Sequence, residues 1–228
     1  MQSNPDISTG LYHGLEAWQV RTPSATAVIS VFGGQLLSFI PDGQPDVLWL
    51  SPKRAGLPTP IRGGVPVCWP WFGRQGQSDD VPAHGLVRTA RWELLQARQG
   101  DDGELELQLA PLSIAECGLR LQMQLRIGRQ LHQQLTTENT STSPVTFTQA
   151  LHSYFRVGDA RRVEVDGLDG LRYLDKYEDY AHLHQQHYVC LEVANAGPEQ
   201  ITLAPGARHQ LVQVLASEPL QAVAGFSE

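Results

Sequence analysis

The sequence predicts an all-β fold, an antiparallel sandwich or barrel that forms a single domain over residues 1–228. Apolar and polar side chains alternate with a period of two in several segments, which is the pattern of half-buried strands. Clusters of glycine, proline, aspartate and serine separate these segments, and helical periodicity is scarce. All-β proteins of this length commonly form one domain.

The strands are expected in the following order along the chain. "TAVISVFGG" at 26–34, "GELELQLAP" at 103–111 and "LRLQMQLRI" at 119–127 alternate most regularly. In the third of these, one face would carry Leu119, Leu121, Met123, Leu125 and Ile127. Between them, "PDGQPD", "RQGDDG" and "NTSTSP" supply turn residues. The rhythm of strand and turn then continues into residues 147–157.

Residues 61–93, "IRGGVPVCWPWFGRQGQSDDVPAHGLVRTARWE", interrupt this pattern. Prolines and glycines recur too often for a helix, and several arginines and tryptophans are interspersed. We expect a long loop that crosses the mouth of a sheet, where binding residues tend to sit on a rigid scaffold.

Charge and composition exclude several functional classes. The net charge is -7, from 17 basic and 24 acidic residues, which argues against nucleic acid as the main partner. The sequence contains no apolar stretch of the length needed to cross a bilayer and no signal-peptide pattern, so we expect no membrane association and a cytoplasmic protein. The three cysteines are widely spaced and form no CxxC pair, which favours reduced thiols over disulfides.

Three cationic or titratable residues in the 61–93 loop are candidates for a binding site. Arg62 precedes Gly63 and Gly64, where the backbone can turn sharply or approach a ligand closely. "AHGLVR" places His84 four residues before Arg88. The alternative is that the arginines form surface ion pairs and the histidine makes a structural hydrogen bond.

Two later segments each carry one candidate for acid or base chemistry. In "ALHSYFRV", His152 lies among apolar and aromatic neighbours, either as a group with a tuned pKa or as a hydrogen-bonded core histidine. In "YVCLEVANA", Glu192 interrupts an apolar run, and strand alternation could turn it either inwards or towards solvent.

"HLHQQH" at 182–187 suggests a metal site, because His182, His184 and His187 are close in sequence. No cysteine or carboxylate stands beside them at a recognised zinc spacing, so a solvated histidine-rich loop is favoured and no metal ligand is assigned. P-loop, GxGxxG and GxSxG patterns are also absent from the sequence.

Five stretches in this order resemble one enzyme group: "IRGGVPVCWPWFG", "PAHGLVRTARWE", "ALHSYFRV", "GLDGLRYLDK" and "VCLEVANA". The chain is similar to the D-hexose-6-phosphate mutarotases, or glucose-6-phosphate 1-epimerases, a branch of the aldose 1-epimerase family. The likeness runs from about the first strand to "LAPGARHQLVQV". It implies a galactose mutarotase-like supersandwich, a large antiparallel β-sandwich with the sugar in a cleft on one sheet.

The resemblance also implies a reaction, the interconversion of the α and β anomers of a hexose 6-phosphate. It assigns the acid to His152 and the base to Glu192. The implied substrate contacts are Arg62, His84, Arg88 and Asp175. Proton transfer alone opens and closes the sugar ring, so the expectation is that no metal and no cofactor are required. The expected partner is a small-molecule sugar phosphate, and a monomer is expected.

Tryptophans in the loop have two interpretations. Trp69, Trp71 and Trp92 could present apolar faces to the sugar ring or could belong to the core.

The chain departs from the family at one place. Between "DKYEDY" and "QHYVCLEVANA" the resemblance implies a segment of several strands, whereas this sequence has only a few residues, an apparent internal deletion near 181–187. Loss of strands would expose sheet edges and disturb the register that aims Glu192. A second hypothesis is therefore a sugar-phosphate binding or regulatory module without turnover. A third hypothesis is a metal-dependent enzyme that uses the three histidines of "HLHQQH".

Overall fold

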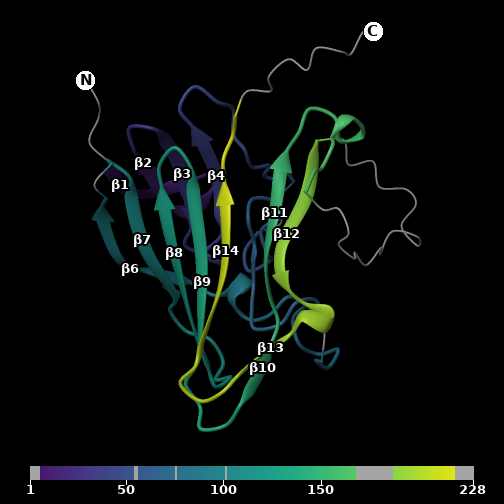
Figure 1. Cartoon of the computed structure of the whole chain (residues 1–228). Helices are drawn as coiled ribbons and strands as arrows, with labels where there is room; N and C mark the ends of the chain where they lie inside the picture. Colours follow the sequence, from purple (N-terminus) through teal and green to yellow (C-terminus); the bar gives the residue numbers. More distant parts are fainter. Residues whose placement is uncertain (1–5, 54–55, 75, 101, 168–186, 219–228) are drawn as a thin grey trace.

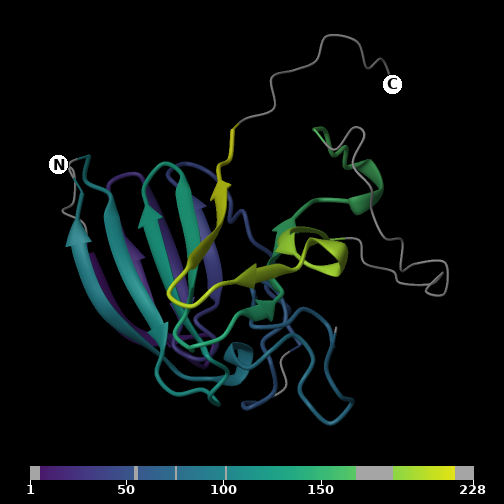
Figure 2. The same cartoon turned by 60° about the horizontal axis from the view of Figure 1, so that its bottom comes forward.

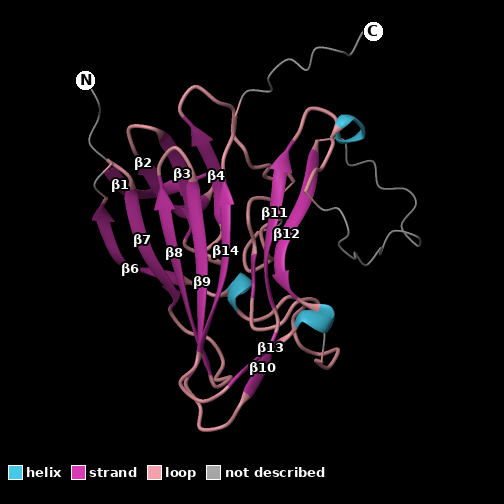
Figure 3. Cartoon of the chain, in the orientation of Figure 1, coloured by secondary structure: helices cyan, strands magenta, loops and turns pink. Residues whose placement is uncertain are grey.

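The computed structural model describes residues 6–53, 56–74, 76–100, 102–167 and 187–218. These ranges consist mainly of antiparallel strands and connecting loops (Figures 1 and 3), which confirms the predicted all-β fold. The helical turns they contain are short 3-10 segments: η1 (Val87–Thr89), η2 (Ala160–Arg162) and η3 (Gly197–Glu199). Within the same ranges, no helix has the length and apolarity required to span a bilayer.

Two large sheets face each other and form the sandwich (Figure 2). The four-stranded sheet has the order β1 (Asp6–Tyr12), β2 (Leu15–Arg21), β3 (Ala25–Ser30) and β4 (Leu36–Pro41). The five-stranded sheet has the order β14 (Arg208–Leu215), β9 (Leu131–Asn139), β8 (Leu119–Ile127), β7 (Leu105–Pro111) and β6 (Trp92–Gln99). Strands predicted at 26–34, 103–111 and 119–127 correspond to β3, β7 and β8, and only β8 has the predicted bounds.

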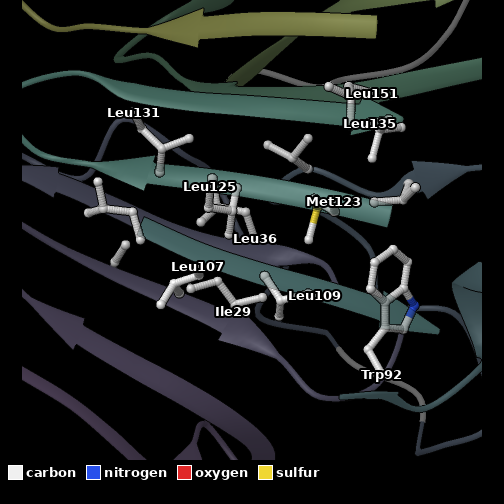
Figure 4. Packing of buried hydrophobic residues seen from close by; sticks show 14 of the residues in the cluster. Ile29, Leu36, Trp92, Leu107, Leu109, Met123, Leu125, Leu131, Leu135 and Leu151 are labelled. Atoms are coloured by element: carbon white, nitrogen blue, oxygen red, sulfur yellow. The ribbon is translucent and has the colours of Figure 1, made fainter. Parts of the chain in front are cut away.

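The core lies between these two sheets and follows from strand alternation (Figure 4). In β8, every second side chain is buried, and Met123 pairs with Leu135 of β9 at full burial. Ile29 and Leu36 of the four-stranded sheet approach from the other side, also fully buried. Each such side chain contributes about 1.5–3 kcal/mol by leaving water, so the register of these strands is strongly specified.

Beside the sandwich stands a smaller sheet with the order β12 (Tyr188–Asn195), β11 (Gln149–Arg156) and β5 (Val67–Cys68). A two-stranded pair, β10 (Val145–Phe147) with β13 (Ile201–Leu203), connects it to the rest of the fold. The strand predicted at 147–157 corresponds mainly to β11. Leu151 of β11 is fully buried in the main core, so the side chains on either side of it must point the opposite way.

A buried polar chain ties β11 to the five-stranded sheet. Ser153 Oγ donates to Gln213 Oε1 of β14 at 2.8 Å, and Gln213 Nε2 donates to Gln133 Oε1 of β9 at 2.8 Å. All three residues are buried, so loss of one partner would leave a costly unpaired polar group. This chain fixes one face of β11 against the sandwich and leaves the other face for the site.

The 61–93 segment is a long connection, as predicted, but its first half contributes to the core. Val65, Val67 and Trp69 are fully buried, and β5 pairs with β11. The first half of the loop is therefore part of the sheet that the loop crosses, and this sheet supports the later loop residues rigidly.

Candidate active site

His152 and Glu192 lie directly opposite each other on the paired strands β11 and β12. The distance from His152 Nε2 to Glu192 Oε1 is 3.1 Å, and the two side chains are 18% and 27% exposed. The ladder settles the question of where Glu192 points: it faces the same side as the histidine. An acid and a base candidate from segments 40 residues apart thus share one partly desolvated site.

The charge state of this pair is set by burial and by neighbouring cations. Burial, followed by the charges of His84, Arg88 and Arg62, lowers the pKa of His152 to about 4. The ring is therefore neutral near pH 7 in the free protein. Its contact with Glu192 is then a hydrogen bond from Nε2–H to the carboxylate, not an ion pair.

Cys190 contacts both His152 and Glu192, and it was not predicted as a site residue from the sequence. Its Sγ lies 2.8 Å from Nδ1 of His152 and 3.8 Å from Oε1 of Glu192. Burial, with the negative charge of Glu192, raises the pKa of the thiol, so it stays protonated and donates to Nδ1. Residues two apart on a strand share a face, so the sequence could have predicted that Cys190 and Glu192 lie side by side.

His84 is held in the loop beside this pair. Its backbone N–H donates to the Gly73 carbonyl at 2.7 Å, and the Gly73 N–H donates to His84 Nδ1 at 3.2 Å. Because Nδ1 accepts, the ring proton is assigned to Nε2. The ring centroid lies 6.1 Å from that of His152 and 4.9 Å from that of Phe72.

The two candidate arginines approach the site from different segments. Arg62 is exposed, and its Nη2 donates to the Tyr188 hydroxyl at 3.2 Å. Arg88 belongs to η1, and its Nε is buried without a hydrogen-bond partner among the described residues. Both charges act on His152, where they help to lower its pKa. Among the described residues, none forms a salt bridge with Arg88.

Aromatic side chains form a wall next to the acid and base. The Tyr154 ring stacks on His152 with centroids 4.8 Å apart and planes 4° apart. Trp49 stacks on Tyr188 at 4.2 Å and lies 6.0 Å from Tyr154. None of these aromatic residues was predicted, although Tyr154 lies two residues after His152 on the same strand and therefore on the same face.

The loop tryptophans belong to the core, not to this wall. Trp69, Trp71 and Trp92 are between 0% and 9% exposed. Each indole N–H donates inside the protein: to Thr137 Oγ1 at 2.9 Å, to the Pro82 carbonyl at 2.9 Å and to the Val87 carbonyl at 3.3 Å. Of their two interpretations, the core is the correct one.

Several sequence candidates lie outside the described residues. Asp175, His182 and His184 fall in the range 168–186, as does most of the apparent deletion. His187 is described and exposed, and its carbonyl accepts a hydrogen bond from the Val157 N–H at 3.1 Å. A separate hollow on the five-stranded sheet, lined by Arg98, His132 and others, is formed by different residues from those around His152.

A family model described as aldose 1-epimerase matches residues 16–183. The match includes His152 and the whole 61–93 loop, and it ends before Glu192. Two curated relatives carry the provisional name glucose-6-phosphate 1-epimerase. The one from Salmonella typhimurium is 35% identical over 186 residues, which cover 78% of this chain and 60% of that protein. The one from Escherichia coli K12 is 36% identical over 186 residues with the same coverage. The chain therefore spans about 60% of the length of these relatives.

Solved structures show the same fold. A Salmonella typhimurium protein described provisionally as a mutarotase superposes with a TM-score of 0.76 at 23% identity, covering 92% of this chain and 94% of that one. A galactose mutarotase related enzyme from Lactobacillus acidophilus gives 0.60 at 13% identity, covering 87% and 96%. The predicted mutarotase-like sandwich is confirmed, and because the family model matches most of the sequence, the chain belongs to the aldose 1-epimerase family.

Proposed function

We propose that the protein interconverts the α and β anomers of a hexose 6-phosphate, glucose 6-phosphate first among them, by acid and base catalysis without a cofactor. The observation that carries this proposal is the opposition of His152 and Glu192 across one strand pair at 3.1 Å, within a site bordered by cations. Anomer interconversion needs an acid and a base at one carbon centre, and this arrangement supplies both.

Ring opening and ring closure each require two proton transfers, one at the C1 hydroxyl and one at the ring oxygen. Glu192 takes the proton of the C1 hydroxyl while His152 gives a proton to the ring oxygen, so the bond from C1 to the ring oxygen breaks and an aldehyde forms. Rotation about C1–C2 presents the other face of the carbonyl. The ring oxygen then returns its proton to His152 and attacks C1, and Glu192 returns the other proton to the new hydroxyl.

The anomeric centre must enter between the two side chains, so their direct hydrogen bond opens when substrate binds. Each would then lie within about 2.6–3.2 Å of its own sugar oxygen. The aromatic wall of Trp49, Tyr154 and Tyr188 offers apolar faces to the C–H surface of the ring beside them.

Arg62 and Arg88 support a phosphorylated substrate. A guanidinium fork binds phosphate oxygens in a bidentate manner, and the buried Nε of Arg88, which has no hydrogen-bond partner within the described ranges, could donate to such an oxygen. The dianion would also offset the two positive charges that disfavour protonation of His152. Phosphate binding would therefore position the sugar and at the same time favour the charged form of the acid.

The test is magnetisation exchange between the α and β anomeric protons of glucose 6-phosphate at equilibrium, measured by NMR with and without the protein. We expect faster exchange with the protein present, and less acceleration with unphosphorylated glucose. Equal acceleration of both sugars would contradict the phosphate preference. No acceleration in a folded sample would reject the epimerase.

A sugar-phosphate binding module is the second candidate, because the chain spans only about 60% of the length of its curated relatives. The same sample distinguishes the two. Shifted or broadened resonances of glucose 6-phosphate without enhanced exchange between anomers would select the binding module.

Replacing Arg88 by alanine should raise the KM for glucose 6-phosphate by about 10-fold to 150-fold, since a hydrogen bond to a charged group contributes about 1.5–3 kcal/mol. The measurement is the substrate dependence of the exchange rate. Arg91→Ala is the matched control, because Arg91 forms an exposed ion pair with Glu16 at 3.0 Å and should change KM little. An unchanged KM in Arg88→Ala would remove Arg88 from the phosphate site.

A further inference from the structure

The active-site strands bring together three side chains of the kinds that bind transition metals. One ligand atom from each of His152, Cys190 and Glu192 lies within 4.8 Å of the others. The separation is 3.8 Å between Sγ and Oε1 and 3.1 Å between Nε2 and Oε1. His152 pairs directly with Glu192, and Cys190 stands two residues before Glu192 on the same face of β12, so the backbone ladder holds all three in place.

The donor set and its dimensions suit one class of ion. Zinc bonds to sulfur, nitrogen and oxygen at about 2.0–2.3 Å, so ligand atoms at tetrahedral corners stand roughly 3.3–3.7 Å apart. The two separations to Oε1 differ from this range by only a few tenths of an ångström. The third separation, from the ring nitrogen to Sγ, is within 4.8 Å, so the imidazole and the thiol must move closer together when one ring nitrogen binds the ion. A nitrogen, a sulfur and an oxygen together favour zinc, cobalt or cadmium over magnesium or calcium, which prefer oxygen ligands alone.

We propose that His152, Cys190 and Glu192 form a binding site for a divalent zinc-like cation, and that this cation excludes the sugar phosphate. Three protein ligands leave a fourth position for water, as in open zinc sites. When the metal binds, the S–H bond of Cys190 breaks, a metal–sulfur bond forms and the proton leaves to the solvent. The inhibitory part rests on the proposed epimerase, because it uses the acid and base as ligands, whereas the binding part does not.

Charge around the site limits which cations can enter. Arg62 and Arg88 repel any cation near His152. The carboxylate of Glu192 and the thiolate of Cys190 contribute two negative charges, which a divalent ion balances. An ion without affinity for thiolate gains only one of these charges, so the site should discriminate strongly against magnesium.

The experiment is a titration of the reduced protein with cobalt(II) chloride, in a buffer with a reductant that contains no thiol. We expect the sulfur-to-cobalt charge-transfer band and the visible bands of four-coordinate cobalt to saturate at one ion per chain. Zinc should displace the cobalt and remove both sets of bands. Absence of a saturable charge-transfer band would overturn the proposal.

Two substitutions locate the site. Cys190→Ser should abolish the charge-transfer band and weaken binding at least about 100-fold, since even loss of an outer-shell partner costs 10-fold to 100-fold. Cys117→Ser is the control, because that half-buried thiol stands on the 112–118 loop and its contact is the Leu119 carbonyl at 3.8 Å. A band that persists in Cys190→Ser and disappears in Cys117→Ser would place the cation elsewhere and refute the site.

Competition separates this inference from the proposed function. Glucose 6-phosphate should raise the apparent dissociation constant for cobalt by a factor of one plus the ratio of its concentration to its own dissociation constant, and zinc should slow anomer exchange. If the protein binds cobalt through Cys190 but does not accelerate exchange, the metal site stands and the epimerase fails. If exchange is accelerated but cobalt does not bind, the epimerase stands and the metal site fails.

Discussion

Replacing Glu192 by glutamine should slow anomer exchange of glucose 6-phosphate by about 10²-fold to 10⁴-fold, the range for loss of one general acid or base. Glutamine keeps the size of the side chain and can still accept the hydrogen bond from His152 Nε2–H. It cannot take up the proton of the C1 hydroxyl. The loss should therefore fall on kcat, with KM nearly unchanged, when both are read from the substrate dependence of the exchange rate.

A matched control removes the same charge elsewhere. Glu199 lies in the exposed turn η3 shortly after β12, so Glu199→Gln should leave the rate within about twofold, because surface substitutions rarely affect a site that they do not touch.

His152→Asn should lower kcat by a factor in the same range as Glu192→Gln. If the two act in one ring-opening step, the double variant will be little slower than either single variant. Multiplicative losses, or a normal rate in Glu192→Gln, would contradict the paired mechanism.

The sequence predicts those parts of the fold that depend on local alternation. Strand β8 was predicted with its bounds because five apolar side chains alternate with polar ones, and burial of one face requires that register. Strand β12 posed a harder case, since an apolar run with one glutamate is compatible with either facing. The cross-strand pairing of His152 with Glu192 decides it, and that pairing is a long-range contact that no local pattern encodes.

The candidate site was predicted only in part, because it too depends on long-range strand pairing. The roles of His152, Glu192 and the loop arginines came from motif resemblance. The spacing of two residues could have placed Tyr154 beside His152 and Cys190 beside Glu192, but only the pairing of β11 with β12 brings these two sets together. The loop tryptophans are a second example, because the sequence left open whether they belong to the core or to the site. Trp69 is fully buried, and its indole N–H donates to Thr137, 68 residues away in sequence, a partner that the loop sequence alone does not reveal.

Replacing Gly64 by alanine should destabilise the protein by about 2–5 kcal/mol, a left-handed backbone penalty plus the cost of overpacking. Gly64 has φ of +61°, and an added Cβ would overlap the carbonyl oxygen of Leu36. Its N–H donates to the Trp49 carbonyl at 2.7 Å, and its carbonyl accepts from the Tyr154 N–H at 2.9 Å. The backbone therefore cannot move away without breaking bonds that support both the core and the aromatic wall.

Gly43→Ala separates the two contributions to this loss. Gly43 has φ of +70°, close to that of Gly64, yet a Cβ there would meet no atom within 4 Å. It should lose only the backbone part, about 1–2 kcal/mol. Midpoints and slopes of urea unfolding give both free energies. Equal losses would mean that the loop relaxes around Gly64 without cost. A larger loss in Gly64→Ala, with slower anomer exchange in the folded fraction, would show that close backbone packing holds the loop in its catalytic position.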